Sequence, residues 1–126
     1  MDNKRLNRVA EAYQHELSKL LHLETREPRL QGVWVTQVIF TPDLKLAKIY
    51  FNVNGGRVRE DEVIAGFEHC KSFLRRELSQ RVKMKYVPDL KFYFDESAEV
   101  NQRIDELFKE IEDQKNGVSK ELSKEN

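Results

Sequence analysis

The chain has 126 residues, a formal net charge of zero and 35% charged residues. This length suffices for one domain with a single two-layer core, but it excludes a multidomain enzyme. The longest apolar run is only a few residues, too short to span a membrane, and the N-terminus has no signal-peptide core. We therefore expect a soluble cytoplasmic protein without a membrane partner.

The first predicted element is an amphipathic helix that ends near Leu23. Asp2 or Asn3 is its predicted N-cap, because short polar side chains accept hydrogen bonds from the first free backbone amides of a helix. The spacing of the apolar residues is helical, so one side of this helix should face the core. These residues are Leu6, Val9, Ala10, Tyr13, Leu17, Leu20 and Leu21.

Two strands are predicted next, after residues 27–32 interrupt the helical pattern. Residues 33–40 and 44–53 are rich in β-branched and aromatic residues, and the short connection at residues 41–43 contains a proline, so the pair should form a hairpin. One sheet face should be buried against the helices. The inward set is Ala47, Ile49, Phe51 and Val53, and the outward set is Lys48, Tyr50 and Asn52.

A glycine turn at residues 54–56 precedes two further predicted helical stretches. One begins near Glu60, the other contains a buried Leu78, and the two abut at Cys70, Lys71 and Ser72. A third strand follows Pro88, because Leu90, Phe92 and Phe94 alternate with polar or amphipathic residues. The order α-β-β-α-α-β, with a last helix over residues 100–111, predicts an α+β domain whose three-stranded sheet is covered by helices.

The domain is predicted to comprise residues 1–115. Residues 116–126 have too little apolar content to order themselves, so we expect a disordered tail.

Motifs for catalysis and cofactor binding give little signal. Gly55-Gly56 lacks the remaining features of a phosphate loop. His15, His22 and His69 have no metal-ligand spacing with a carboxylate, and the lone Cys70 is better explained as a small buried thiol. We therefore expect no cofactor, no metal and no enzymatic activity. A small hydrolase is a remote alternative.

A basic segment is the main positive signal. Residues 71–85 hold six cations and one acid, Glu77, a local net charge of +5. Helical geometry separates these cations from the apolar stripe, and a face selected only for solubility would interleave more acids, so the pattern favours contact with phosphates. The alternative is an ordinary solvated helix face. The residues predicted to contact phosphates are Arg75, Arg76 and Lys83, with Lys71, Arg81 and Lys85 as secondary contributors.

A second cationic group lies at the start of the first helix, where it opposes the positive end of the helix dipole. It consists of Lys4, Arg5 and Arg8. Local helix stability does not explain these residues, so they are further candidates for phosphate contact; a solvated terminus is the alternative. Residues 95–113, by contrast, hold eight acids and two cations, a net charge of −6. That segment should face away from nucleic acid or shield the basic face.

Several segments, in order and with similar spacing, resemble the bacterial ribosome-binding factor A family over residues 5 to about 108. The most specific is Val87-Pro88-Asp89-Leu90-Lys91-Phe92-Tyr93-Phe94-Asp95-Glu96-Ser97. The others are Arg8-Val9-Ala10-Glu11, Glu27-Pro28-Arg29-Leu30, Val35-Thr36-Gln37-Val38 and Asp43-Leu44-Lys45-Leu46-Ala47-Lys48-Ile49-Tyr50.

The resemblance implies a type II KH-like fold and a monomeric assembly factor. Such a factor binds the free 30S subunit and assists late maturation of the 5′ end of 16S rRNA, notably in the cold. The family usually has alanine, any residue and glycine at the interhelical kink, where this chain has Cys70, Lys71 and Ser72. The alternative function, from another class, is a KH-like adaptor that uses the same basic surface to bind an acidic protein.

Overall fold

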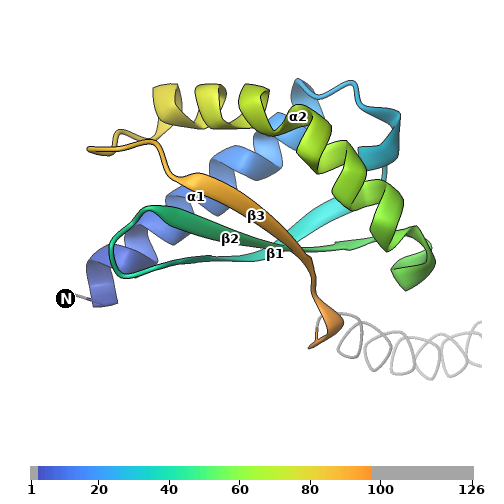
Figure 1. Ribbon diagram of the computed structural model, residues 1–126, viewed down its shortest axis with the longest axis horizontal. Coiled ribbons are helices and arrows are strands. Elements are labelled where there is room, and N and C mark those ends of the chain that lie inside the picture. The colour runs from blue at the N-terminus through green and yellow to red at the C-terminus, as the bar shows by residue number, and fades with distance from the viewer. Residues whose placement is uncertain (1–2, 98–126) are drawn as a thin grey trace, which may run out of the picture. The chain divides into compact units, whose positions relative to one another are not determined.

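The computed structural model describes residues 3–97, which form an α+β fold with one three-stranded sheet (Figure 1). The predicted C-terminal helix, the tail and the N-cap at Asp2 lie outside the described residues. Neither of the two described α-helices is long and apolar enough to cross a membrane. The elements are α1 Asn3–Leu23, β1 Val33–Phe40, β2 Leu46–Val53, α2 Glu60–Arg81 and β3 Asp89–Phe94, with 3-10 turns at Pro28–Leu30 and Gly56–Arg59.

The sheet confirms the predicted strands and adds their pairing. Its order is β1-β2-β3, with β1 antiparallel to β2 and β2 parallel to β3. The β1–β2 turn is closed by Asp43, whose carboxylate accepts hydrogen bonds from the Thr41 hydroxyl at 2.7 Å and the Lys45 backbone amide at 3.0 Å. The parallel β2–β3 pair requires a long crossover connection, which α2 supplies.

The core lies between one face of the sheet and the two helices. α1 packs on β1, α2 packs on β3, and the helices contact each other. The predicted inward residues of β2 are buried, and Leu78 of α2 is fully buried as predicted. The ring of Phe67 on α2 stacks on Phe92 of β3 with centroids 4.3 Å apart. This packing fixes the position of α2, and therefore of the loop that follows it.

Asn52 lies on the side of β2 opposite the inward set, as predicted, but unlike Lys48 and Tyr50 it is buried there. Its side chain is 1% exposed. The amide nitrogen donates to the Asp95 carbonyl at 3.3 Å, and the amide oxygen accepts from the backbone N–H of Val53 at 2.7 Å. A buried amide needs such partners, and the chain leaving β3 supplies one of them.

The prediction of two abutting helices is also wrong, because α2 is one uninterrupted helix over Glu60–Arg81. None of Cys70, Lys71 and Ser72 is a glycine or proline, so none imposes a helix break. The ribbon of α2 nevertheless changes direction about midway along its length (Figure 1). The assignment of that bend to Cys70–Ser72 stays a prediction.

Gly66 allows the segment before β1 to approach α2 closely. A Cβ atom built at Gly66 would lie 2.9 Å from the Cβ of Arg29 and 3.1 Å from a methyl group of Leu30. The first distance is shorter than side chains tolerate, so the helix needs a glycine here despite its low helix propensity. The nearby Cys70 packs against the core and is half-buried, and burial raises the pKa of its thiol.

Candidate nucleic-acid interface

The loop between α2 and β3, residues 82–88, forms the centre of the candidate site. α2 ends at Arg81, and Val82 is extended, with φ −124° and ψ 106°. Lys83 therefore lies in the loop and not on the helix, which corrects the prediction that it projects from the same helical face as Arg76. Val82 packs against the core at the point where the chain leaves the helical path.

Arg75 holds this loop in place. Its Nε donates to the Pro88 carbonyl at 3.0 Å and its Nη2 to the Val87 carbonyl at 3.2 Å. A guanidinium has five N–H donors, so these two bonds leave donors for another ligand. Contact between Arg75 and RNA remains a prediction, but the geometry already gives this side chain a structural role.

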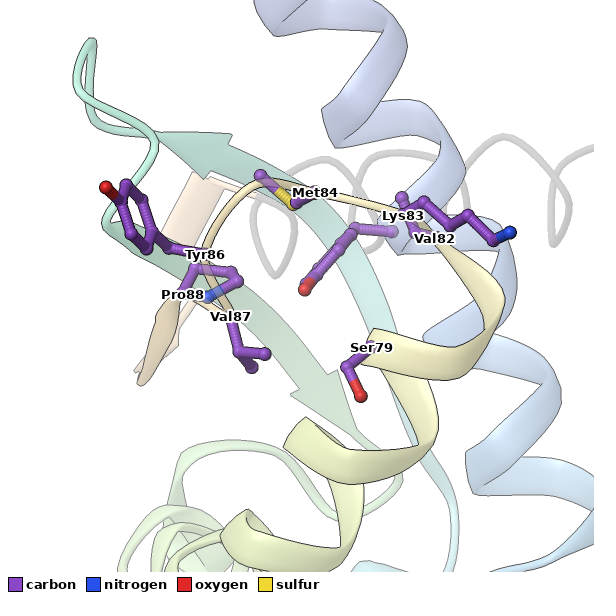
Figure 2. A pocket seen from close by; sticks show the side chains of 8 residues that line it. Ser79, Val82, Lys83, Met84, Tyr86, Val87 and Pro88 are labelled. Carbon is purple, nitrogen blue, oxygen red and sulfur yellow. The ribbon is translucent and has the colours of Figure 1, made fainter.

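Tyr86 stands out of the loop, with 60% of its surface exposed. The ammonium of Lys85 lies 5.4 Å from the centroid of its ring, a cation–π distance. Tyr86 lines a hollow of about 240 Å³ whose floor includes Tyr13. Figure 2 shows Tyr86 and Lys83 on opposite sides of this hollow, with Met84 and Ser79 between them at its other two edges. An exposed ring beside cations can stack on a base while the cations contact phosphates.

A second hollow beside Tyr86 brings the two predicted cationic groups together. It has a volume of about 280 Å³, and Arg5 of α1 lines it with Lys83 and Lys85 of the loop. Asp43 is the one acid in this lining. The hydrogen bond from the Thr41 hydroxyl is the main cause that lowers the pKa of Asp43, with the Lys45 amide next. Three cations against one internally bonded carboxylate leave this hollow positive.

A third hollow, of about 520 Å³, is also lined by Tyr86. Lys45 from the β1–β2 turn and Arg75 from α2 line it, together with Asp89. Lys45 is exposed. We call the exposed cations Arg5, Lys45, Lys83 and Lys85, together with Tyr86, the basic loop surface.

Two of the predicted secondary residues are engaged with acids of the chain itself. Arg81 lies 2.6 Å from a Glu24 oxygen and 3.4 Å from a Glu16 oxygen, both on or next to α1. The hydrogen bond to Glu24 is the main cause that raises the pKa of Arg81. Lys71 lies 3.0 Å from a Glu68 oxygen and 3.9 Å from an Asp89 oxygen. Their charge is therefore largely balanced within the protein.

The remaining predicted cations are exposed but do not line the three hollows around Tyr86. Arg76 lies 5.8 Å from the Phe73 ring centroid, and Lys4 and Arg8 are on the first turns of α1. Sequence reasoning missed Lys45 and Tyr86. Tyr86 had a local signal, because an aromatic residue follows Lys83-Met84-Lys85 directly. Lys45 had none, since only the fold brings the hairpin turn to this loop.

Within residues 3–97, no group of three or more histidine, cysteine or carboxylate side chains could hold a metal ion. The side chains of the basic loop surface offer ionic contact, hydrogen bonding and ring stacking to an external ligand. The fold and this surface together define a KH-like α+β protein with a cationic, aromatic-bearing loop.

The family model described as ribosome-binding factor A matches residues 5–108 of the chain. Two relatives of that name support the match. The protein from Desulfatibacillum aliphaticivorans is 36% identical over 107 residues, which cover 85% of this chain and 87% of the relative. The protein from Trichlorobacter lovleyi is 39% identical over 111 residues, which cover 88% and 90%. The chain belongs to the ribosome-binding factor A family.

Solved structures agree on the fold. The crystal structure of ribosome-binding factor A from Thermus thermophilus matches with a TM-score of 0.64 at 18% identity, covering 71% of this chain and 93% of that one. A Thermus thermophilus ribosome-binding factor A homology model, fitted into the cryo-EM map of a 30S complex, matches with a TM-score of 0.53 at 21% identity. It covers 73% of this chain and 92% of that one.

Proposed function

We propose that this protein binds the free 30S ribosomal subunit through its basic loop surface and assists late maturation of 16S rRNA. Membership of the ribosome-binding factor A family supports binding to the ribosome. The Thermus thermophilus relative fitted into a 30S complex map supports the small subunit as the partner. We further propose a monomeric, non-enzymatic cytoplasmic factor that acts at the 5′ end of 16S rRNA, with most importance in the cold.

The convergence of Arg5 with Lys83 and Lys85 is the observation that carries this proposal. These residues lie at opposite ends of the described chain, yet they line one hollow beside Tyr86. Among the described residues, none of the three has an ion pair with an acid, in contrast to Lys71 and Arg81. Cations that the fold gathers but does not neutralise suit phosphate contact.

The proposed mechanism is docking by charge and shape. The cations contact phosphates of folded rRNA, and Tyr86 offers its exposed ring to an unpaired base. Such binding involves no bond making or breaking in the RNA. It holds one rRNA arrangement until maturation is complete, and the factor then leaves before the subunits join.

The proposal is tested by co-sedimentation of full-length variants with purified 30S subunits. Lys83→Glu/Lys85→Glu should abolish co-sedimentation, because two phosphate-facing charges are reversed. Lys19→Glu/Arg26→Glu is the matched control, since both residues are exposed, lie away from the basic loop surface and carry the same total charge. Equal binding by the two double variants would place the contact elsewhere.

Ribonuclease treatment separates this function from the adaptor alternative. If the protein contacts rRNA, its association with particles in a cell extract should disappear when the RNA is digested. An adaptor bound to an acidic protein should stay associated. Gradient sedimentation of the untreated extract should show the protein on free 30S subunits and little of it on joined ribosomes.

A further inference from the structure

The sheet face opposite the helices carries a second ordered set of side chains. Across the three strands, Ile39, Lys48 and Lys91 form one row in register, and Gln37, Tyr50 and Tyr93 form the next. Ile39 is 44% exposed and Tyr93 36% exposed. We call these two rows the open sheet face. It lies across the sheet from the core and shares no residue with the basic loop surface.

The two tyrosines of this face form a stacked pair. Their ring centroids are 5.3 Å apart, and the ring planes are 27° from parallel. Each ring therefore uses one face against the other. Tyr93 lies on β3, which is an edge strand of the described sheet, so its second ring face is turned away from Tyr50 toward that edge. A planar base could extend this stack by one ring.

Two lysines lie beside the tyrosine pair. Lys48 and Lys91 are directly opposite each other in the β2–β3 register, two residues before Tyr50 and Tyr93 in each strand. Like charges at opposite positions of a sheet destabilise it, so their placement is not explained by strand pairing. Neither has an ion pair with an acid among the described residues.

The two acids at the ends of β3, Asp89 and Asp95, are already engaged. Asp95 directly follows β3, two residues after Tyr93. It is buried and accepts a hydrogen bond from the Thr36 hydroxyl. Asp89, at the other end of β3, lies 3.9 Å from the Lys71 ammonium and accepts from the backbone amide of Leu90 at 2.9 Å. The centre of the open sheet face therefore combines positive charge with exposed aromatic surface.

We propose that the open sheet face binds a short single-stranded RNA segment. One base stacks on the exposed face of Tyr93, and the flanking phosphates contact Lys48 and Lys91. Aromatic rings next to a row of cations on a solvent-exposed sheet favour single strands, because bases in a duplex are stacked on each other and offer no free ring face. This proposal rests on the proposed function only in taking RNA as the ligand. The open sheet face is a different surface from the basic loop surface.

The test uses the full-length chain and a fluorescently labelled octaadenylate. Trp34 is the one tryptophan of the chain and pairs with Asn52 in the next outward row, so its emission reports on this face. Octaadenylate should quench Trp34 emission on binding. Tyr50→Leu/Tyr93→Leu, which keeps apolar cover over the sheet, should weaken octaadenylate binding about tenfold or more. Binding of heparin, a polyanion without bases, should be unchanged by these substitutions.

A lysine variant provides a second test that does not alter the aromatic pair. Lys48→Gln/Lys91→Gln should reduce the salt dependence of octaadenylate binding by somewhat under two units on a log–log plot. Lys19→Gln/Arg26→Gln, at two exposed positions that belong to neither proposed RNA surface, is the control and should leave Trp34 quenching intact.

The outcomes separate this proposal from the proposed function. Unchanged octaadenylate affinity in the folded tyrosine variant, or binding without any change in Trp34 emission, overturns the sheet-face proposal. Neither result affects the co-sedimentation of Lys83→Glu/Lys85→Glu, which tests the basic loop surface alone. If the open sheet face instead binds a protein or the chain's own acidic segment, octaadenylate should not bind to this face. Trp34 emission will then not change on addition of octaadenylate, and this result overturns the proposal.

Discussion

The cations of α2 and the cations of the loop that follows it differ in what the fold does with them. On α2, Arg75 bonds to loop carbonyls and Arg81 bonds to glutamates of the α1 region. In the loop, Lys83 and Lys85 are exposed and gather with Arg5 beside Tyr86. The sequence shows one continuous basic segment, but the structure divides it into a structural part and a part free for a ligand. Charge density along a chain is therefore a weaker guide to a binding surface than charge left unpaired by the fold.

The largest expected effect concerns the buried side of α2, which positions both sets of cations. Leu78 is fully buried, so Leu78→Ala should lower the free energy of unfolding by about 2–5 kcal/mol through lost burial and a residual cavity. Gln80→Ala, at an exposed position of the same helix, is the control and should change little. Denaturant titration measures both. Equal midpoints for wild type and Leu78→Ala would contradict the packing described here.

The second-largest expected effect on stability concerns Arg75, which holds the loop after α2. Arg75→Ala removes two hydrogen bonds to the loop carbonyls of Val87 and Pro88, and should cost about 1–2 kcal/mol of stability. Arg76→Ala is the matched control, because its neighbouring guanidinium is exposed and lies over the Phe73 ring. If thermal unfolding shows equal losses for the two variants, Arg75 does not hold the loop. A charge-reversal variant that includes Arg75 would thus disturb the loop as well as any RNA contact.

Most of the fold could be predicted from the sequence, because periodicity is a local signal. The first helix, the hairpin and the third strand follow from the spacing of residues such as Leu17, Ile49 and Phe92, all of which are buried. The burial of Asn52 could not be predicted, since the carbonyl group that accepts its amide hydrogen bond lies 43 residues away in sequence. The continuous α2 was missed because the apolar spacing was divided into two helical stretches at residues 70–72, although Cys70, Leu74 and Leu78 follow one another at a four-residue interval that fits a single helix.

The candidate site was less predictable, because ion pairing is a property of the fold. The scarcity of acids was judged along residues 71–85, where Glu77 is the one acid. The two acids that lie nearest to Arg81 come instead from the α1 region, 57 and 65 residues away in sequence, and both are closer to its guanidinium than Glu77, at 3.9 Å. For the same reason, the approach of Arg5 and Lys45 to the loop has no sequence signal. Tyr86 could have been predicted as a binding residue, because it is an aromatic residue that directly follows the last lysine of the basic segment.

A pair of single alanine variants compares a free cation with a paired one directly. Lys83→Ala should reduce the slope of log affinity against log salt for 30S binding by somewhat under one unit, because one phosphate contact is lost. Arg81→Ala should leave that slope unchanged and lower the melting temperature instead, by an amount that shrinks as salt screens the lost pairs. The reverse pattern would show that pairing within the protein does not decide which cations bind RNA.

The smallest expected effect concerns another paired cation, Arg29, and it is a pH dependence. The hydrogen bond from Arg29, at 2.6 Å, is the main cause that lowers the pKa of Glu27 from 4.5 to about 2. Because the pKa is lower in the folded state, the carboxylate stabilises the fold above pH 4.5. That contribution is lost as the pH falls toward 2. The melting temperature of Glu27→Gln should therefore depend less on pH than that of the wild type in this window, whereas above it the variant should melt at a lower temperature.

Glu68→Gln is the control, because its partner Lys71 also lies near Asp89, and it should keep the acid sensitivity of the wild type. Parallel pH profiles for wild type and Glu27→Gln would mean that the Arg29 pair adds nothing to stability. Pairing within the protein would then be too weak a criterion to separate structural cations from those of the basic loop surface.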